Sequence, residues 1–341
     1  MTYNVDNITD LKKAIASSEA NITINVTKSF KIDSLITIPD NKNITITTND
    51  RENCILMRDK DYLSYFFSLY ATTTATLTLA NIILDGNRDN ISQDTNSFII
   101  SNGTVNINDS ILRNNNSGAN GAGAIWNGSR TVNTNSSTFI NNSGKEGGVI
   151  RGSGGNLNFK NTTFINNTAL NGGAISAGSE TVIENSSFKN NTASNNGGAI
   201  NFEISNRSLT IIDSEFLGNK ATDGGSISQK NKYYGSTCTI KGNTSFINNS
   251  ASNNGGAIYI DKLESLSVEK DGIFKNNIAK EGYIIHPNDI SLHNKYVLTK
   301  TFTMPFEYGY NNYDINYTNG TIYELKPIAI ELKATKIVVH R

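Results

Sequence analysis

The chain has few of the residues that metal centres, disulfide frameworks and membrane spans require. Its 341 residues include 2 cysteines, 3 histidines and 4 prolines. Cys54 and Cys238 are far apart in the sequence, and their surroundings show no zinc-binding or disulfide spacing. We therefore expect no metal and no cofactor. No run of about 20 apolar residues is present, so we expect no transmembrane segment.

An excess of charge of either sign is also missing. The chain has 30 Lys and Arg residues and 30 Asp and Glu residues, which gives a formal net charge of zero. Nucleic-acid-binding domains normally carry a basic surface, so we expect no nucleic-acid partner. The first ten residues, MTYNVDNITD, are polar and contain no apolar stretch of a signal peptide. If the protein is exported, we expect that this start has been trimmed.

Asparagine, serine, threonine and glycine take the place of the missing residue types. The chain contains 52 asparagines, and only 37% of its residues are hydrophobic. Such polarity is compatible with disorder, but the apolar residues recur at regular intervals, which favours an ordered repeat. The few prolines fit a chain of strands and tight turns, because proline cannot donate a hydrogen bond to a β ladder.

The repeat spans residues 111–285 and has a period of 24 to 30 residues. Each copy contains an apolar anchor and an asparagine three residues later. A glycine then follows, with an isoleucine two residues after it, as in NTTFINNTALNGGAI. The anchors are Ile111, Phe139, Phe164, Phe188, Phe216, Phe246 and Phe274. The asparagines are Asn114, Asn142, Asn167, Asn191, Asn219, Asn249 and Asn277. The glycines are Gly123, Gly148, Gly173, Gly198, Gly225, Gly256 and Gly282.

This period fits one coil of a parallel β-helix or one leucine-rich repeat. The copies lack the leucines of the second class, and their glycines and β-forming residues disfavour helical repeats. Short β-type runs separated by NN, GG and NG indicate strands and turns. The sequence therefore predicts an all-β, right-handed parallel β-helix solenoid of about ten coils and roughly 50 Å in length.

Equivalent residues of successive coils would stack about 4.8 Å apart. We expect the anchor phenylalanines to form an internal stack. We expect Asn142, Asn167, Asn191, Asn219, Asn249 and Asn277 to form a structural ladder of amide hydrogen bonds. The glycines would provide a positive φ or a close backbone approach. In this register Cys54 and Cys238 lie about 30 Å apart, so they form no disulfide.

The chain divides into three segments. Residues 1–20 are predicted to form an N-terminal helical cap, with Thr9 as its N-cap and with Leu11 and Ile15 on its apolar face. Residues 21–295 are predicted to form the parallel β-helix. Residues 296–341, in which tyrosines cluster and the repeat stops, are predicted to form a β-rich C-terminal cap or the start of a linker to a further domain.

The residue after each repeat isoleucine should face outwards, because side chains alternate along a strand. These residues are Trp126, Arg151, Ser176, Asn201, Ser228 and Tyr259, and they would form one row along the rod. Tryptophan and arginine are enriched at binding hot spots, so we interpret the row as a candidate ligand-binding strip. The alternative is an ordinary solvated face with Trp126 covered by a loop. Tyr233 and Tyr234 are a second candidate, for which local packing is the simpler explanation.

Many parallel β-helices are polysaccharide lyases or glycoside hydrolases, and a hydrolase needs two carboxylates within several ångström of each other. Asp85, Asp89 and Asp109 are the best local candidates, but we favour turn formation as their explanation, with Asp85-Gly86 as a turn and Asp109 as an Asx-type turn residue.

A calcium-dependent lyase would instead use Asp213, Glu215 and Glu184, with Lys160 nearby. No histidine lies in the repeat body and no nucleophile arrangement is visible. We therefore expect no catalytic residue, and we keep a carbohydrate-active enzyme as the alternative.

The repeated FxxN and GGAI motifs resemble those of the polymorphic outer-membrane proteins of chlamydiae. The asparagine-rich form, with NNTA and NNGGAI, is more similar to the adhesin-like surface proteins of methanogenic archaea. The resemblance implies a parallel β-helix at the cell surface that attaches, as a monomer, to a glycan or protein of a partner cell. Both motifs build coils, so no functional residue is carried over, and a purely structural stalk is a further alternative.

Overall fold

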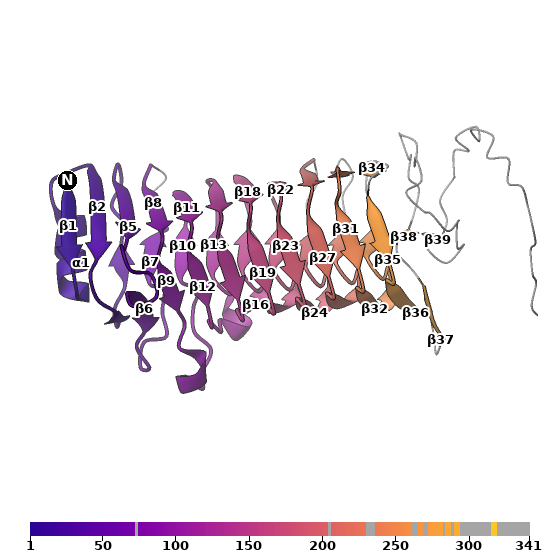
Figure 1. Cartoon of the computed structure of the whole chain (residues 1–341), viewed down its shortest axis with the longest axis horizontal. Helices are drawn as coiled ribbons and strands as arrows, with labels where there is room; N and C mark the ends of the chain where they lie inside the picture. Colours follow the sequence, from indigo (N-terminus) through magenta and orange to yellow (C-terminus); the bar gives the residue numbers. More distant parts are fainter. Residues whose placement is uncertain are drawn as a thin grey trace, which may run out of the picture.

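The chain forms a parallel β-helix, as the sequence predicts (Figure 1). The structure, a computed structural model, describes residues 1–71, 74–203, 206–229, 236–260 and 272–281, and the strands at 265–268, 284–287, 290–293 and 315–318. The predicted C-terminal segment 296–341 lies outside the described residues, apart from one strand. Within these ranges, no helix has the length and apolar content needed to cross a membrane.

Three long parallel sheets, which we name A, B and C, run the length of the rod, and a shorter sheet D begins at its middle. Sheet A contains β1 (Thr2–Val5), β2 (Asn21–Val26), β5 (Asn43–Thr47), β8 (Thr76–Ala80), β11 (Thr104–Asn108), β14 (Val132–Asn135), β18 (Asn156–Lys160), β22 (Glu180–Glu184), β26 (Ser208–Ile212), β30 (Thr237–Lys241) and β34 (Ser265–Val268). Sheet B contains β3 (Phe30–Ile32), β6 (Ile55–Arg58), β9 (Ile83–Asp85), β12 (Ile111–Arg113), β15 (Thr138–Ile140), β19 (Thr163–Ile165), β23 (Ser187–Lys189), β27 (Glu215–Leu217), β31 (Ser245–Ile247) and β35 (Ile273–Lys275).

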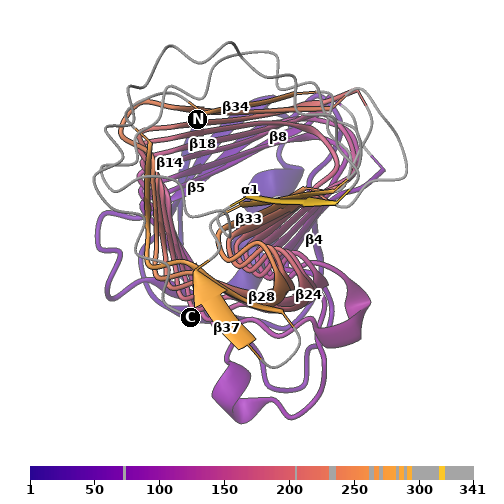
Figure 2. The ribbon, with the colours of Figure 1, turned by 90° about the vertical axis from the view of Figure 1, so that its right-hand side faces the viewer.

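In the second half of the rod each coil visits the sheets in the order A, B, D and C, and Figure 2 shows this cross-section along the axis. Sheet C contains β4 (Ile36–Thr37), β7 (Phe67–Leu69), β10 (Ile99–Ser101), β13 (Ile125–Asn127), β17 (Ile150–Gly152), β21 (Ile175–Ala177), β25 (Ile200–Phe202), β29 (Ile227–Gln229), β33 (Ile258–Ile260), β38 (Ile290–His293) and β39 (Ile315–Thr318). Sheet D contains β16 (Ser143–Glu146), β20 (Thr168–Asn171), β24 (Thr192–Asn196), β28 (Lys220–Asp223), β32 (Ser250–Asn254), β36 (Ile278–Glu281) and the antiparallel β37 (Ile284–Pro287).

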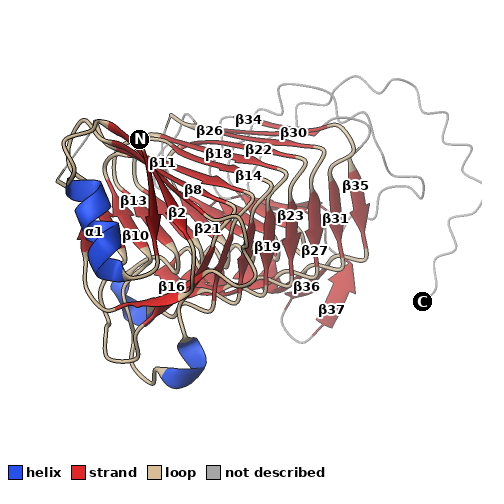
Figure 3. Cartoon of the chain, turned by 60° about the vertical axis from the view of Figure 1, so that its left-hand side comes forward, coloured by secondary structure: helices blue, strands red, loops and turns tan. Residues whose placement is uncertain are grey.

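Helix α1 (Ile8–Ala16) lies across the N-terminal end of the rod (Figure 3). Its apolar face buries Leu11, Ala14 and Ile15 against the core, which removes the open end of the solenoid from water. The predicted N-cap, Thr9, is wrong: the side chain of Asn7 accepts the backbone N–H of Asp10 at 2.9 Å. Strand β1, which the sequence did not predict, precedes the helix and already pairs with β2.

The anchor phenylalanines stack inside the rod, with neighbouring ring centroids 4.5 to 5.2 Å apart. The register of the first copy differs from the prediction by one residue. Leu112 pairs with Phe139 and is fully buried, whereas Ile111 pairs with Thr138 and is partly exposed. The first copy has two adjacent apolar residues, Ile111 and Leu112, at the anchor position. Either residue fits the repeat period, so the sequence alone did not reveal this shift.

A ladder of buried asparagines runs along the corner between sheets B and D. Each amide nitrogen donates to the carbonyl of the anchor residue in the preceding coil, which is Leu112 for Asn142 and a phenylalanine for the others. From Asn142 to Asn249, the amide nitrogen also donates to the side-chain oxygen of the next asparagine. Asn191, for example, donates to Phe164 O and to Asn219 Oδ1, both at 3.0 Å. Each side-chain oxygen also accepts the backbone N–H of the preceding asparagine, as Asn191 Oδ1 does from Asn167 at 3.0 Å. The members are Asn142, Asn167, Asn191, Asn219, Asn249 and Asn277, all at most 1% exposed.

The first copy joins this ladder through Asn115, not through the predicted Asn114. The backbone N–H of Asn115 donates to Asn142 Oδ1 at 3.2 Å. Asn114 instead has a φ of 56° and forms the turn, as Asn141 does in the next coil with the same φ. The NN pair therefore has two separate functions: the first asparagine takes a left-handed backbone conformation that this residue type tolerates, and the second enters the ladder.

The two glycines of the GG pair between sheets D and C also have separate functions. The first glycine has a positive φ, 63° at Gly197, which is strained for other residue types. The second glycine packs against the next coil, where a Cβ on Gly198 would lie 2.0 Å from the carbonyl oxygen of Gly225. One glycine is therefore required by conformation and the other by space.

A second ladder, of hydroxyl groups, occupies the corner between sheets A and B and was not predicted. The Ser186 hydroxyl accepts the backbone N–H of Thr162 at 3.1 Å and donates to the carbonyl of Glu184 at 2.8 Å. Equivalent buried hydroxyls belong to Ser110, Ser137, Thr162, Ser214 and Thr244. These groups pair backbone atoms that would otherwise be buried without partners.

The guanidinium of Arg58 occupies the start of the asparagine ladder. It is fully buried, donates to Asn115 Oδ1 at 2.9 Å and to the carbonyls of Tyr62 and Asn96, and lies over the ring of Phe66. Burial lowers the pKa of Arg58 to about 10. Since its partners belong to two long loops, Arg58 joins these loops to the first coil of the ladder.

Cys54 and Cys238 are buried and form no disulfide, as expected. Burial raises the pKa of the Cys238 thiol from its ordinary value of 9.0 to about 12. The folded core therefore favours the neutral thiol of Cys238 over the thiolate.

Replacing Asn191 with alanine should lower the free energy of unfolding by about 2–5 kcal/mol, because buried groups of Asn167, Phe164 and Asn219 lose their partners. Urea unfolding followed by circular dichroism measures this change. The matched control is Asn190→Gly, at an exposed turn position with a φ of 55°, where we expect a change below about 0.5 kcal/mol. Equal destabilisation by both variants would contradict the role of the ladder.

In the Cys54→Ala variant, Cys238 should react with a thiol reagent between pH 8 and 10 at least about 100-fold more slowly in the folded than in the urea-unfolded protein. As the pH rises above 9.0, the unfolded thiol ionises and the buried thiol does not. The contribution of this thiol to stability therefore decreases between pH 9 and about 12. Equal labelling rates for folded and unfolded protein would refute the buried position.

Candidate functional site

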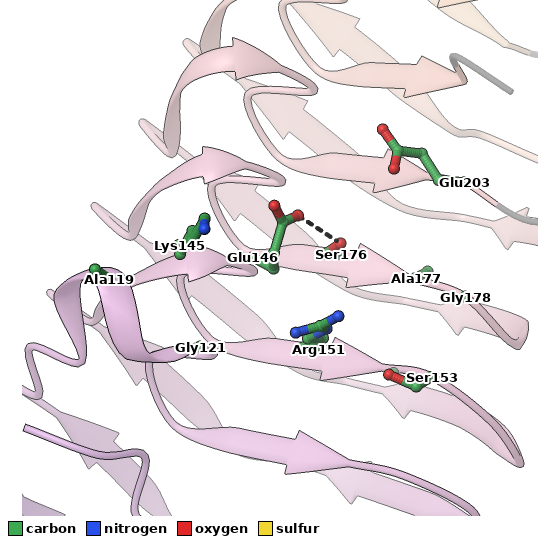
Figure 4. Close-up of a pocket in the computed structure, with 11 residues that line it drawn as sticks. Ala119, Gly121, Lys145, Glu146, Arg151, Ser153, Ser176, Ala177, Gly178 and Glu203 are labelled. Carbon is green, nitrogen blue, oxygen red and sulfur yellow. Dashed lines mark hydrogen bonds between the residues drawn. The ribbon is translucent and has the colours of Figure 1, made fainter.

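A cleft of about 520 Å³ lies where the chain passes from sheet D to sheet C (Figure 4). Its polar lining residues are Lys145, Glu146, Arg151, Ser153, Ser176 and Glu203. Glu146 ends β16, Arg151 and Ser176 are the central residues of β17 and β21, and Glu203 follows β25. Together with Ala119 and Gly121 of the preceding coil, these residues come from four successive coils, and the cleft extends along the rod axis. The turn that contains the short 3-10 helix η2 (Gly118–Asn120) borders it through Ala119 and Gly121.

The predicted row of outward residues is present as one register line across sheet C. Trp126 pairs with Arg151, Arg151 with Ser176, and Ser176 with Asn201, and the line continues through Ser228 to Tyr259. Only the first three residues are partly exposed. Asn201 and Ser228 are 0% exposed and Tyr259 is 5% exposed, so the expectation that the whole row faces solvent is wrong. A side chain that points away from the core is still buried where other parts of the chain cover that face.

The buried part of the row retains unpaired polar groups. Among the residues that the structure describes, both amide atoms of Asn201 and the hydroxyl of Ser228 have no hydrogen-bond partner, and the same holds for the hydroxyl of Ser226, which lies outside the row. Buried polar groups of this kind are uncommon in folded proteins. These three residues are fully buried and are not among the residues that line the cleft.

Trp126 supports the cleft and does not line it. The guanidinium carbon of Arg151 lies 5.4 Å from the centre of the indole ring, a cation–π arrangement. A Cβ on Gly121 would lie 3.6 Å from Trp126 Cε3, so the backbone of the η2 turn also packs against the ring. The interpretation of Trp126 as covered by a neighbouring turn fits these contacts better than an open stacking surface.

The charged groups of the cleft differ in their partners. Glu146 accepts hydrogen bonds from the amide of Asn171 at 3.1 Å and from the hydroxyl of Ser176 at 3.5 Å. Within the part of the chain that the structure describes, neither Lys145 nor Arg151 forms an ion pair. The cleft therefore presents two unpaired cations beside a carboxylate that already has two donors.

The sequence-based interpretation missed Lys145, Glu146 and Glu203. A signal for Glu146 existed: the residue before each GG pair is polar, and these residues align across sheet D as Glu146, Asn171, Asn196, Asp223 and Asn254. Lys145 and Glu203 have no such repeated position, and only the coil geometry brings them to the cleft.

The candidate acids of the first coils have structural roles. Asp85 accepts the backbone N–H of Asn87 at 2.9 Å and pairs with Arg113 at 2.7 Å, while Asp109 has a φ of 48° in a turn. Asp89 is exposed in the short 3-10 helix η1 (Arg88–Asn90). The turn interpretation accounts for all three.

The candidate calcium residues are engaged in links between coils. Glu184 pairs with Lys160 at 3.2 Å, and Glu215 pairs with Lys189 at 2.9 Å. Asp213 accepts the backbone N–H of Asn243 at 2.9 Å. The described residues contain no group of three or more side chains of the types that bind metals. Tyr233 and Tyr234 lie outside the described residues.

Removing the guanidinium in Arg151→Ala should expose the indole of Trp126 and shift its fluorescence maximum to longer wavelength by several nanometres. Trp126 is the single tryptophan of the chain, so the emission spectrum reports this site alone. Arg88→Ala, in the exposed η1 turn, is the control and should leave the spectrum unchanged. An unshifted spectrum in Arg151→Ala would show that the two side chains do not stack in solution.

Three segments of the chain, residues 161–178, 185–203 and 238–261, match the Chlamydia polymorphic membrane protein repeat. No curated protein matches the chain. Among solved structures, the chain is similar to the A-module of mannuronan C-5 epimerase AlgE4 of Azotobacter vinelandii, with 14% identity, 87% of this chain and 100% of that chain covered, and a TM-score of 0.30. It is also similar to the A-module of AlgE6 from the same organism, with 10% identity, 82% and 99% coverage, and a TM-score of 0.27. The matched repeat segments include both the ladder asparagines and the GG turns that build the coils.

Proposed function

We propose that this chain is an adhesin-like module of a cell surface that attaches to a glycan or protein of a partner cell and that it does not catalyse a reaction. The match to the Chlamydia polymorphic membrane protein repeat supports the surface location. The resemblance of the asparagine-rich repeats to adhesin-like proteins of methanogenic archaea supports the same assignment. The rod fits this function, because it displays side chains from several coils along one line.

The cleft at Arg151 is the observation that carries the proposed binding role. Four coils contribute to it, its lining is mainly polar and charged, and its cations are unpaired in the described part of the chain. A groove with hydroxyl, carboxylate, ammonium and guanidinium groups can bind a polar ligand by directed hydrogen bonds. A purely structural stalk does not require such a groove.

A carbohydrate-active enzyme is the second candidate, because two carboxylates, those of Glu146 and Glu203, line the same cleft. Paired carboxylates are the groups that glycoside hydrolysis uses. Against catalysis, Glu146 has its oxygens engaged by Asn171 and Ser176. We favour binding without turnover for this reason.

Binding to a glycan array and to whole candidate partner cells tests the proposal. We expect selective binding by the purified chain, a loss of at least about 10-fold in Arg151→Ala and in Trp126→Ala, and unchanged binding in Arg88→Ala. Each bound glycan is then incubated with the protein and analysed by mass spectrometry. Unaltered glycans support a binding module, whereas cleaved or epimerised glycans that survive with Arg88→Ala and disappear with Glu146→Gln would establish the enzyme. Absence of binding to every glycan and cell would leave the structural stalk.

A further inference from the structure

We infer that the cleft recognises a saccharide that carries a carboxylate, with Arg151 as the residue that contacts this carboxylate and Trp126 as the positioning residue for Arg151. This inference rests on the proposed binding function and names the class of its ligand. Nothing in the repeat motif requires an arginine at this position, because the equivalent residues in the next coils are Ser176 and Asn201.

The guanidinium of Arg151 is held in place without being neutralised. It lies over the ring of Trp126, which is itself packed against Gly121, and within the described residues it forms no ion pair. A flexible arginine loses conformational freedom when it binds a ligand, and prior positioning reduces this cost. The planar guanidinium matches a carboxylate by two parallel hydrogen bonds. The site is therefore organised for a carboxylate before any ligand arrives.

The charges of the cleft change along the rod. Lys145, Glu146 and Arg151 lie in the same coil, beside the η2 turn, where the two cations exceed the one carboxylate, and Glu203 lies two coils further on, after β25. Figure 4 shows the side chains of Glu146, Arg151 and Glu203 projecting from their strands on the cleft side. The anionic group of the ligand is therefore expected at the coil of Arg151, and its uncharged hydroxyls beside Ser176.

A saccharide fits this cleft better than a peptide does. Peptides commonly bind by adding a strand to a free sheet edge or by filling apolar pockets. Strand β17 is paired on both sides, with β13 and β21, and β21 is paired with β17 and β25. The apolar lining side chains are those of Ala119 and Ala177 alone. The cleft therefore offers a peptide neither a free sheet edge nor an apolar pocket, whereas its hydroxyl, carboxylate and cationic groups are suited to sugar hydroxyls.

The test compares uronate- and sialate-containing oligosaccharides with their carboxyl-reduced counterparts, which retain the sugar ring and lose the charge. We expect the wild-type chain to bind the acidic form about 10- to 100-fold more tightly, the range that one charge-assisted pair provides. Arg151→Gln should abolish this preference while weak binding of the reduced form is retained, and Arg151→Lys should restore part of it.

The role of Trp126 is tested by the ratio of the affinities for the acidic and the carboxyl-reduced saccharide. This ratio would not change if Trp126 only stabilised the fold. In Trp126→Ala the ratio of the two affinities should fall towards one, and in Trp126→Phe it should be largely retained, because phenylalanine keeps a ring under the guanidinium. Far-ultraviolet circular dichroism of each variant, with Arg88→Gln as control, establishes that the β-helix is intact.

The outcomes separate this inference from the proposed function. Binding confined to neutral or carboxylate-free sulfated saccharides, or undiminished binding after carboxyl reduction, would overturn the inference and leave glycan binding intact. Binding of peptides alone would overturn the choice of a saccharide. If no glycan, peptide or cell binds, the proposed function itself fails and the inference fails with it.

Discussion

The ladder of buried asparagines is the constraint on which the rest of this β-helix depends. From Asn142 to Asn249, each amide satisfies a backbone carbonyl, a backbone N–H and the amide of the next coil, as Asn191 does for Phe164, Asn167 and Asn219. The chain turns sharply at this corner, so these backbone groups have no sheet partner and would otherwise be buried unpaired, at a cost of about 1–3 kcal/mol each. Because the ladder continues through every coil from Asn115 to Asn277, it stabilises the corner as one cooperative structure.

The ladder also fixes the register, and the register places the cleft. A shift of one residue along a strand would turn each core side chain to the surface and each surface side chain to the core. With the asparagines in register, Ile150 and Ile175 face the core, and Arg151 and Ser176 align on the opposite face. The site is therefore a consequence of coil geometry, and Glu146 also links two coils through the hydrogen bond that it accepts from Asn171.

The sequence predicted those features that recur at a fixed period. The phenylalanine stack was predicted in this way, because the same residue type recurs at one position of successive coils and its role can be inferred from that recurrence. The hydroxyl ladder repeats equally well. However, both Ser and Thr occur in it and both are frequent throughout the chain, so its period could not be recognised in the sequence. Arg58 and the N-cap Asn7 occur once, and their roles depend on loops and termini that no repeat describes. The partial burial of the outward row depends likewise on which segments cover each coil, which alternation along a strand does not specify.

Recognition in such a rod has to reside in the positions that the repeat leaves free. A solenoid with identical coils would present the same side chain every ~4.8 Å and would distinguish ligands poorly. Here the row begins with tryptophan and arginine and continues with serine and asparagine, while the isoleucines beside them, Ile125, Ile150, Ile175 and Ile200, do not vary. The cleft also starts where sheet D begins and the η2 turn replaces a regular corner. Local departures from the repeat thus coincide with Lys145 and Arg151, the two cations of the cleft, which is the pattern expected when a uniform scaffold carries a specific site.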